Sequence, residues 1–97
     1  MIKSKRLVFE NTDDFTVRTL GDILDSDFPF TQVFITVEGG NVVIGDSNLS
    51  TTEFGAKITS GQGRVLFEFN HRDDVCNNLY LRSAIAQDDV TIYILAF

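Results

Sequence analysis

The chain has 97 residues, of which 43% are hydrophobic, and its 14 acidic and 8 basic residues give a formal net charge of −6. This length fits one domain with one core, and the composition is that of a folded chain. The negative charge repels a phosphate backbone, and the apolar runs are shorter than the ~20 residues of a membrane-spanning helix, so we expect no nucleic acid and no membrane among the partners.

The first thirty residues predict one hairpin followed by an irregular segment. Apolar side chains alternate in residues 5–10 and again in residues 15–19, and the polar stretch 11–14 between them has the composition of a turn. Residues 20–30 follow neither the period of a strand nor that of a helix. We therefore expect a loop there, with at most one helical turn.

The next part of the chain predicts a second hairpin and an edge strand. Residues 33–37 and 42–44 are rich in β-branched side chains, and Gly39-Gly40-Asn41 between them favours the positive φ angles of a tight turn. Residues 46–52 predict a polar loop after this hairpin. A short edge strand is expected over residues 54–58.

Three further strands are predicted at residues 64–70, 79–83 and 90–97, and the first of them shows the alternation of a half-buried strand. In the first of them the inward side chains are expected to be Val65, Phe67 and Phe69. Glycine or polar composition predicts turns at residues 61–63, 71–74 and 84–89. The last strand is apolar on one face and half apolar on the other, which predicts a central position in a sheet or an outer face covered by another subunit.

Together these elements predict an all-β fold, a small antiparallel β-sandwich that is jelly-roll-like and has about seven or eight short strands. A partly open barrel would give the same pattern of strands and turns. We expect residues 1–97 to form this single domain. Residues 1–5 are expected either to extend from it as an N-terminal arm or to fray.

Residues with the chemistry of catalysis or metal binding are few and scattered. His71 is the single histidine and lies in a polar turn, and Cys76 is the single cysteine, expected as a small residue at the start of a strand. We therefore expect no enzyme, no metal and no cofactor. Asp22, Asp25 and Asp27 predict either a solvated acidic surface or a calcium-binding loop, although their spacing is not that of an EF-hand.

Two aromatic regions are candidates for contact with a partner. Phe28 and Phe30 flank the single proline, Pro29, and either present their rings to a partner or plug one end of the sandwich. Tyr93 and Phe97 in the last strand belong either to the core or to an interface.

Residues 33–97 contain a series of short motifs in a fixed order. Residues 40–50 have the sequence Gly-Asn-Val-Val-Ile-Gly-Asp-Ser-Asn-Leu-Ser, and Gly55 follows within a loop. An alternating strand, a Leu-Tyr dipeptide, an Ala-containing turn and a closing strand complete the series. In this order and spacing the chain resembles the small structural proteins of tailed-phage virions, although Gly55-Ala56-Lys57-Ile58 departs from their usual Gly-x-Pro-Leu.

The resemblance implies a non-enzymatic virion protein, either a capsid decoration (cement) protein that binds the outside of the head and stabilises it, or a head–tail or tail accessory protein. It implies that the partners are the major capsid protein and copies of the chain itself, for which we expect a homotrimer at the capsid symmetry axes. On this hypothesis the N-terminal basic residues reach a neighbouring subunit or an acidic capsid patch; these are Lys3, Lys5 and Arg6.

Two other classes of function compete with this interpretation. A carbohydrate-binding module is also a small β-sandwich, but it normally presents an exposed aromatic platform, and this chain has no Trp and two Tyr. A small enzyme would need a nucleophile with a base, and the sequence offers no pair that includes its one histidine.

Overall fold

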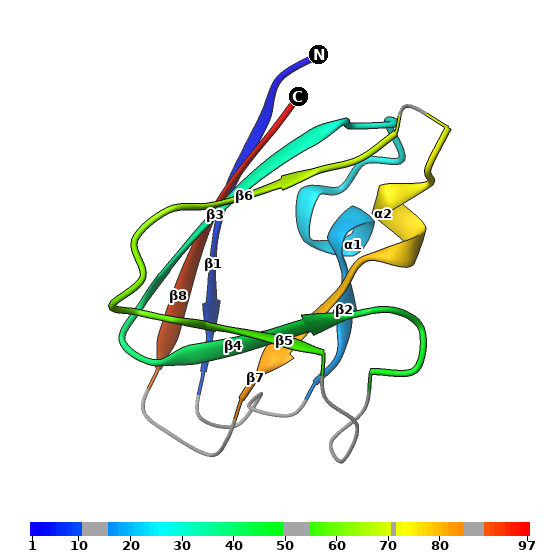
Figure 1. The fold of residues 1–97 in the computed structure, drawn as a ribbon. Coiled ribbons are helices and arrows are strands. Elements are labelled where there is room, and N and C mark those ends of the chain that lie inside the picture. Colours follow the sequence, from blue (N-terminus) through cyan, green and yellow to red (C-terminus); the bar gives the residue numbers. More distant parts are fainter. Residues whose placement is uncertain (11–15, 50–54, 71, 85–88) are drawn as a thin grey trace.

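A computed structural model describes residues 1–10, 16–49, 55–70, 72–84 and 89–97 of the chain (Figure 1). Within these residues the chain forms eight strands and two short helices. The strands are β1 (Lys3–Phe9), β2 (Arg18–Thr19), β3 (Gln32–Glu38), β4 (Asn41–Gly45), β5 (Ala56–Thr59), β6 (Val65–Glu68), β7 (Tyr80–Ser83) and β8 (Val90–Ala96). The helices are α1 (Leu20–Leu24) and α2 (Val75–Asn78).

The strands form two four-stranded antiparallel sheets. Sheet A has the order β1-β8-β3-β6, and sheet B has the order β2-β7-β4-β5. The pairs β4–β5, β3–β6, β2–β7 and β1–β8 are those of one long antiparallel ribbon that folds back at its middle and rolls up. Pairing of β3 with β8 and of β4 with β7 closes the roll, so the predicted jelly-roll-like sandwich is confirmed.

The two predicted hairpins are wrong, because successive strands lie in different sheets. β1 pairs with β8 and β2 pairs with β7, while β3 belongs to sheet A and β4 to sheet B. The turn at Gly39 does exist, with φ of 87°, and a Cβ atom there would lie 2.8 Å from the carbonyl oxygen of Asp89. The two residues between β3 and β4 carry the chain around a corner of the sandwich instead of reversing it within one sheet.

The core fills the space between the sheets, and period-two alternation decides which side chains enter it. Burial alternates strictly along β3 and β8, and β8 lies inside sheet A, which confirms the predicted central position. The predicted edge strand is β5, and the predicted inward residues Val65, Phe67 and Phe69 pack against the core. The largest fully buried apolar side chains are Phe9, Phe30, Leu20, Leu24, Ile35, Ile58, Leu81 and Ile92.

The two helices lie side by side at one end of the sandwich (Figure 1). α1 is a five-residue helix, slightly longer than the single turn predicted, and the Thr19 hydroxyl caps it by accepting from the backbone N–H of Asp22. α2 was not predicted, and Cys76 lies within it instead of starting a strand, so that expectation is wrong. Neither helix in the described part of the chain is long and apolar enough to span a bilayer.

The N-terminal residues are a strand and not an extended arm. β1 begins at Lys3 and pairs with β8 along its whole length, so the expectation of an arm over residues 1–5 is wrong for all but Met1 and Ile2. β1 is the edge of sheet A, and the basic side chains of Lys5 and Arg6 are exposed there. Charged residues on an edge strand hinder its pairing with another sheet.

Candidate functional site

The outer face of sheet A carries a continuous row of apolar side chains. Leu95 on β8 lies opposite Phe34 on β3, and Phe34 lies opposite Leu66 on β6. Outward side chains alternate with the core residues, so Tyr93 and Phe97 lie on either side of Leu95 on the same face. We call the five residues the apolar face: Phe34, Leu66, Tyr93, Leu95 and Phe97.

Four of these five side chains are large, apolar and well exposed. The exposed fractions are 41% for Leu66, 38% for Tyr93, 40% for Leu95 and 37% for Phe97. The rings of Phe34 and Phe97 have their centroids 5.6 Å apart and their planes tilted by 31°, so they pack on one another at the surface. Contiguous apolar side chains on three neighbouring strands are uncommon on a protein that stays alone in solution.

Charged groups border the apolar face. The Arg64 guanidinium lies 4.8 Å from the centroid of the Phe34 ring, and Glu68 follows four residues later at the end of β6. The Tyr93 hydroxyl donates to the Glu38 carboxylate over 3.4 Å. Arg6 on β1 lies opposite Tyr93. The face therefore combines an apolar centre with a charged rim, as protein interfaces do.

The outer face of sheet B is different, because other parts of the chain cover it. Val43 is buried in a second, smaller apolar cluster with Leu49 and Ala84, and Val17 and Tyr80 pack against this cluster. Arg82, opposite Val43, is fully buried, and its Nη1 donates to the carbonyl oxygens of Ser83 and Ala84. Burial lowers the pKa of the Arg82 guanidinium from its usual value. We therefore find no large apolar side chain exposed among the described residues of this face.

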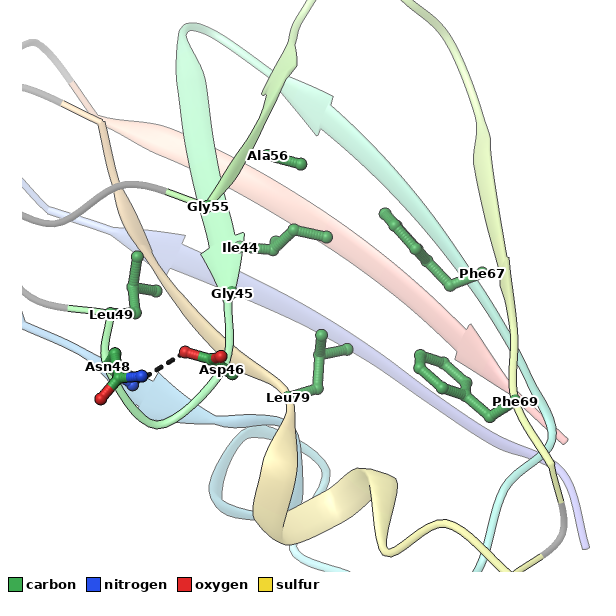
Figure 2. Close-up of a pocket in the computed structure, with 10 residues that line it drawn as sticks. All are labelled: Ile44, Gly45, Asp46, Asn48, Leu49, Gly55, Ala56, Phe67, Phe69 and Leu79. Atoms are coloured by element: carbon green, nitrogen blue, oxygen red, sulfur yellow. Dashed lines mark hydrogen bonds between the residues drawn. The ribbon is translucent and has the colours of Figure 1, made fainter.

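A pocket of about 470 Å³ opens between the sheets beside β4 and β6 (Figure 2). Figure 2 shows Phe67 on β6 and Phe69, which directly follows this strand, pointing toward the side of Ile44 and Leu79. Polar groups gather at one end, where the Asn48 backbone N–H donates to the Asp46 carboxylate over 2.9 Å. The lining is completed by Gly45, Leu49, Gly55 and Ala56.

The structure divides the predicted contact residues into two groups. Phe30 is fully buried and the half-buried Phe28 packs on it with ring centroids 5.1 Å apart, so the hypothesis that both rings face a partner is wrong; they plug one end of the sandwich. Pro29 alone of the three is exposed. Tyr93 and Phe97, in contrast, lie on the outer face of sheet A and not in the core.

Three residues of the apolar face were missed by the sequence prediction: Phe34, Leu66 and Leu95. Each is an apolar residue that lies out of phase with the inward residues of its own strand. In the runs 33–35, 65–67 and 92–95, both the inward and the outward positions therefore carry apolar residues. Such runs indicate that the outward face of a strand is covered by another element or binds a partner, and they could have identified this surface.

The residues with metal-binding or nucleophilic chemistry lie elsewhere. Within the described ranges, no three His, Cys, Asp or Glu side chains form a group that could hold a metal ion, and this includes Asp22, Asp25 and Asp27. His71 lies outside the described residues. The buried Cys76 thiol donates to the Phe28 carbonyl oxygen over 3.3 Å. Burial raises the pKa of this thiol, and the carboxylates of Asp74 and Asp27 raise it further.

No protein-family model matches the sequence, and no curated protein matches it. Among solved structures, ToxT from Vibrio cholerae bound to (E)-4-(8-methylnaphthalen-1-yl)but-3-enoic acid is similar, with a TM-score of 0.57 and 8% identity over 99% of this chain and 30% of that chain. ToxT bound to an unsaturated fatty acid has a TM-score of 0.52 and 14% identity over 100% of this chain and 28% of that chain. The chain thus spans less than a third of ToxT.

A cupin-family protein from Methanocaldococcus jannaschii, with a double-stranded β-helix fold, has a TM-score of 0.57 and 10% identity. That similarity covers 98% of this chain and 68% of the cupin. At such low identities these likenesses show the fold alone, and they agree with the strand order of the two sheets.

Proposed function

We propose that the chain is a non-enzymatic structural protein of a tailed-phage virion, a capsid decoration protein that assembles through protein contacts on the outer face of sheet A. The observation that carries the proposal is the apolar face. It exposes four large side chains, whereas the described residues on the outer face of sheet B expose no large apolar side chain. A surface of this kind is suited to binding protein and offers no groups for transforming a substrate.

The composition of the face supports a protein partner. Tyr, Phe and Arg are enriched at the centres of protein interfaces. Here Tyr93 and Phe97 flank Leu95, and Arg64 lies over the ring of Phe34, which is opposite Leu95. All five residues of the apolar face lie on paired strands or directly after one, which holds them in place before binding. A rigid surface loses little conformational entropy on association.

The virion assignment is supported by the resemblance over residues 33–97 and by the fold, since eight-stranded jelly rolls recur in viral capsid proteins. One residue of the resembling pattern has a clear structural role. A Cβ atom at Gly55 would overlap the carbonyl oxygen of Ile44, so the loop can approach β4 only with glycine at this position. We propose the major capsid protein as partner and the outside of the head as location; a head–tail or tail accessory position is the alternative.

A direct test uses virions of the phage that encodes the chain, prepared without it. Purified wild-type protein added to these particles should co-sediment up to a saturating ratio. Leu95→Glu, which places a charge at the centre of the apolar face, should bind at least about tenfold more weakly. Lys57→Glu, an exposed charge change on sheet B, is the matched control and should bind like wild type. Absence of wild-type binding would overturn the virion proposal, and equal binding of Leu95→Glu would remove the apolar face from it.

Sugar binding is less well supported by the same surface. Stacking on a sugar needs an open, flat aromatic platform, but the Arg64 guanidinium already lies over the Phe34 ring at 4.8 Å. The Phe97 ring is tilted by 31° against that ring. A glycan array should therefore give no hits, and specific binding that is lost in Phe97→Ala would favour a carbohydrate-binding module.

The pocket between the sheets supports a second candidate function, binding of a small neutral apolar molecule. Its volume of about 470 Å³ and its six apolar side chains suit such a ligand. Two of the similar ToxT structures hold a carboxylic acid. Here the polar end carries the Asp46 carboxylate, which repels an acid. A long-chain alcohol should then raise the melting temperature more than the matching fatty acid, and no shift with either would exclude this candidate.

A further inference from the structure

We propose that two copies of the chain pair face to face through the apolar face, around a two-fold axis that crosses the strands of sheet A along the row Leu95, Phe34 and Leu66. This inference names a second copy as the first partner of the face and rests on the proposed function. The pair would then be the unit that attaches to the capsid, and pairing would make that attachment bivalent.

The outward residues of sheet A are ordered so that this axis matches them with one another. A two-fold axis across the strands lays each strand against the same strand of the second copy, running in the opposite direction. Leu66 on β6 and Leu95 on β8 then face their own counterparts. The residue two positions before each leucine in one copy then faces the residue two positions after the same leucine in the other copy. Tyr93 of one copy therefore faces Phe97 of the other.

The charges on β6 obey the same symmetry. Arg64 lies two residues before Leu66 and Glu68 lies two residues after it, and both side chains are exposed on the outer face. The axis therefore places Arg64 of each copy opposite Glu68 of the other, and it forms two such ion pairs. Opposite charges across an interface fix its register and penalise other arrangements.

The alternative two-fold axis, parallel to the strands, is disfavoured by charge. It would lay β1 of one copy over β6 of the other. Arg6 lies opposite Tyr93, and Tyr93 lies opposite Thr36. The last β3–β6 pair is Ile35 with Val65, so the next residues of the two segments, Thr36 and Arg64, fall in the same row. Arg6 and Arg64 therefore lie in the same row and would meet as like charges.

The size of the face sets the strength of the pair. Four strands about 4.8 Å apart and outward rows about 7 Å apart give a contact on the order of 1,000 Å² for both copies together, the lower end for specific interfaces. We therefore expect a reversible dimer that dissociates on dilution. A closed two-fold contact uses the whole face of both copies, so assembly stops at two, whereas a ring of three needs two different patches on each copy.

Sedimentation of the purified protein over a wide range of concentration tests the inference without any capsid. The mass should rise from 10.9 kDa to twice that value and no further. Arg64→Glu and Glu68→Arg should each weaken the dimer roughly tenfold or more, because each variant puts like charges opposite one another. An equimolar mixture of the two variants should form a heterodimer, and the double variant R64E/E68R should dimerise like wild type.

Three controls show whether the apolar face itself forms the dimer. Lys57→Glu lies on sheet B and should leave the dimer unchanged. Leu95→Thr, which keeps a good strand former, should weaken the dimer, and urea unfolding of every variant at low concentration checks that it folds. A monomer at all concentrations, a species of three times the monomer mass, or no rescue in the mixture would each overturn the two-fold pair.

The outcome also separates this inference from the proposed function. A monomeric protein that binds capsids through the apolar face would leave the proposed function standing and remove the pair. A dimer that shows no binding to the virions would do the reverse.

Discussion

The two sheets of the sandwich have apolar residues at outward positions, but they differ in what covers them. On sheet B, Val43 is 1% exposed because Leu49, Val17 and Tyr80 pack over and around it. On sheet A, Leu95 is 40% exposed at the equivalent kind of position. An apolar residue on the outer side of a strand therefore indicates a second covering layer, which the chain supplies for sheet B and, on our account, another protein supplies for sheet A.

The largest effect should come from a matched pair of charge substitutions, one on each outer face. Val43→Lys should lower the free energy of unfolding by about 4 kcal/mol, because an ammonium group would be buried in the apolar cluster beside the buried Arg82 guanidinium. Leu95→Lys should lower it by about 1 kcal/mol or less, since the side chain stays in water. Urea unfolding at concentrations where the protein is monomeric measures both, and equal losses would refute the contrast between the faces.

A second pair of variants tests how closely the chain at Gly55, just before β5, packs on the backbone of β4. Gly55→Ala should lower the free energy of unfolding by about 3 kcal/mol, because its Cβ would overlap the backbone oxygen of Ile44 and the loop would have to move away from β4. Gly61→Ala is the control, since its Cβ would meet no atom within 4 Å, and it should change stability by less than about 0.5 kcal/mol. Thermal unfolding of both variants measures this difference. If Gly55→Ala were as stable as Gly61→Ala, the result would contradict the close packing of Gly55 on β4.

The closed end of the sandwich gives a smaller, pH-dependent effect at Cys76. Burial raises the pKa of this thiol in the folded chain above its ordinary value of 9.0. The folded state then holds the proton more tightly than the unfolded state, so the stabilisation is complete below the unfolded pKa and is lost as the pH rises through the folded pKa.

Wild-type protein should therefore lose stability relative to Cys76→Ala when the pH rises above about 9. Urea unfolding of both proteins at several pH values measures this difference. A difference that does not change between pH 7 and pH 10 would show that the thiol is not enclosed in the folded chain.

The smallest effect concerns the charged rim of the apolar face. The contact between Arg64 and the Phe34 ring should contribute about 0.5 kcal/mol, as exposed cation–π pairs do. A double-mutant cycle with Arg64→Ala and Phe34→Leu, run on the monomer, isolates this coupling. A coupling of zero would mean that the guanidinium is free for a partner and does not rest on the ring.

The sequence predicted the strands and the buried faces but not the way in which strands pair. Period-two alternation identified Val65 and Phe67 as inward residues because it depends only on the pleat. It could not show that β1 pairs with β8, since those segments are far apart in sequence and any antiparallel neighbour would satisfy the same pattern. The glycine turn at Gly39 was correct as a turn, yet a positive φ does not determine whether the chain stays in one sheet.

The sequence predicted only the part of the apolar face that lies on the last strand, because it could not show which strands are neighbours. The excess of apolar residues in the last strand indicated either a central position or a covered outer face, and the structure has β8 in a central position with Tyr93 and Phe97 on its outer side. Phe34 and Leu66 complete the apolar face only because β3 and β6 lie beside β8 and beside each other. That adjacency follows from the rolled topology and not from local pattern.

The central claim is that the outer face of sheet A binds a second copy of the chain while the outer face of sheet B is closed by its own chain. Methyl NMR of the wild-type protein over a dilution series tests it most directly, because each face has its own methyl groups. Our account predicts that the signals of Leu66 and Leu95 shift with concentration and that those of Val43 and Leu49 do not. Constant signals on sheet A, or shifts on sheet B, would contradict it.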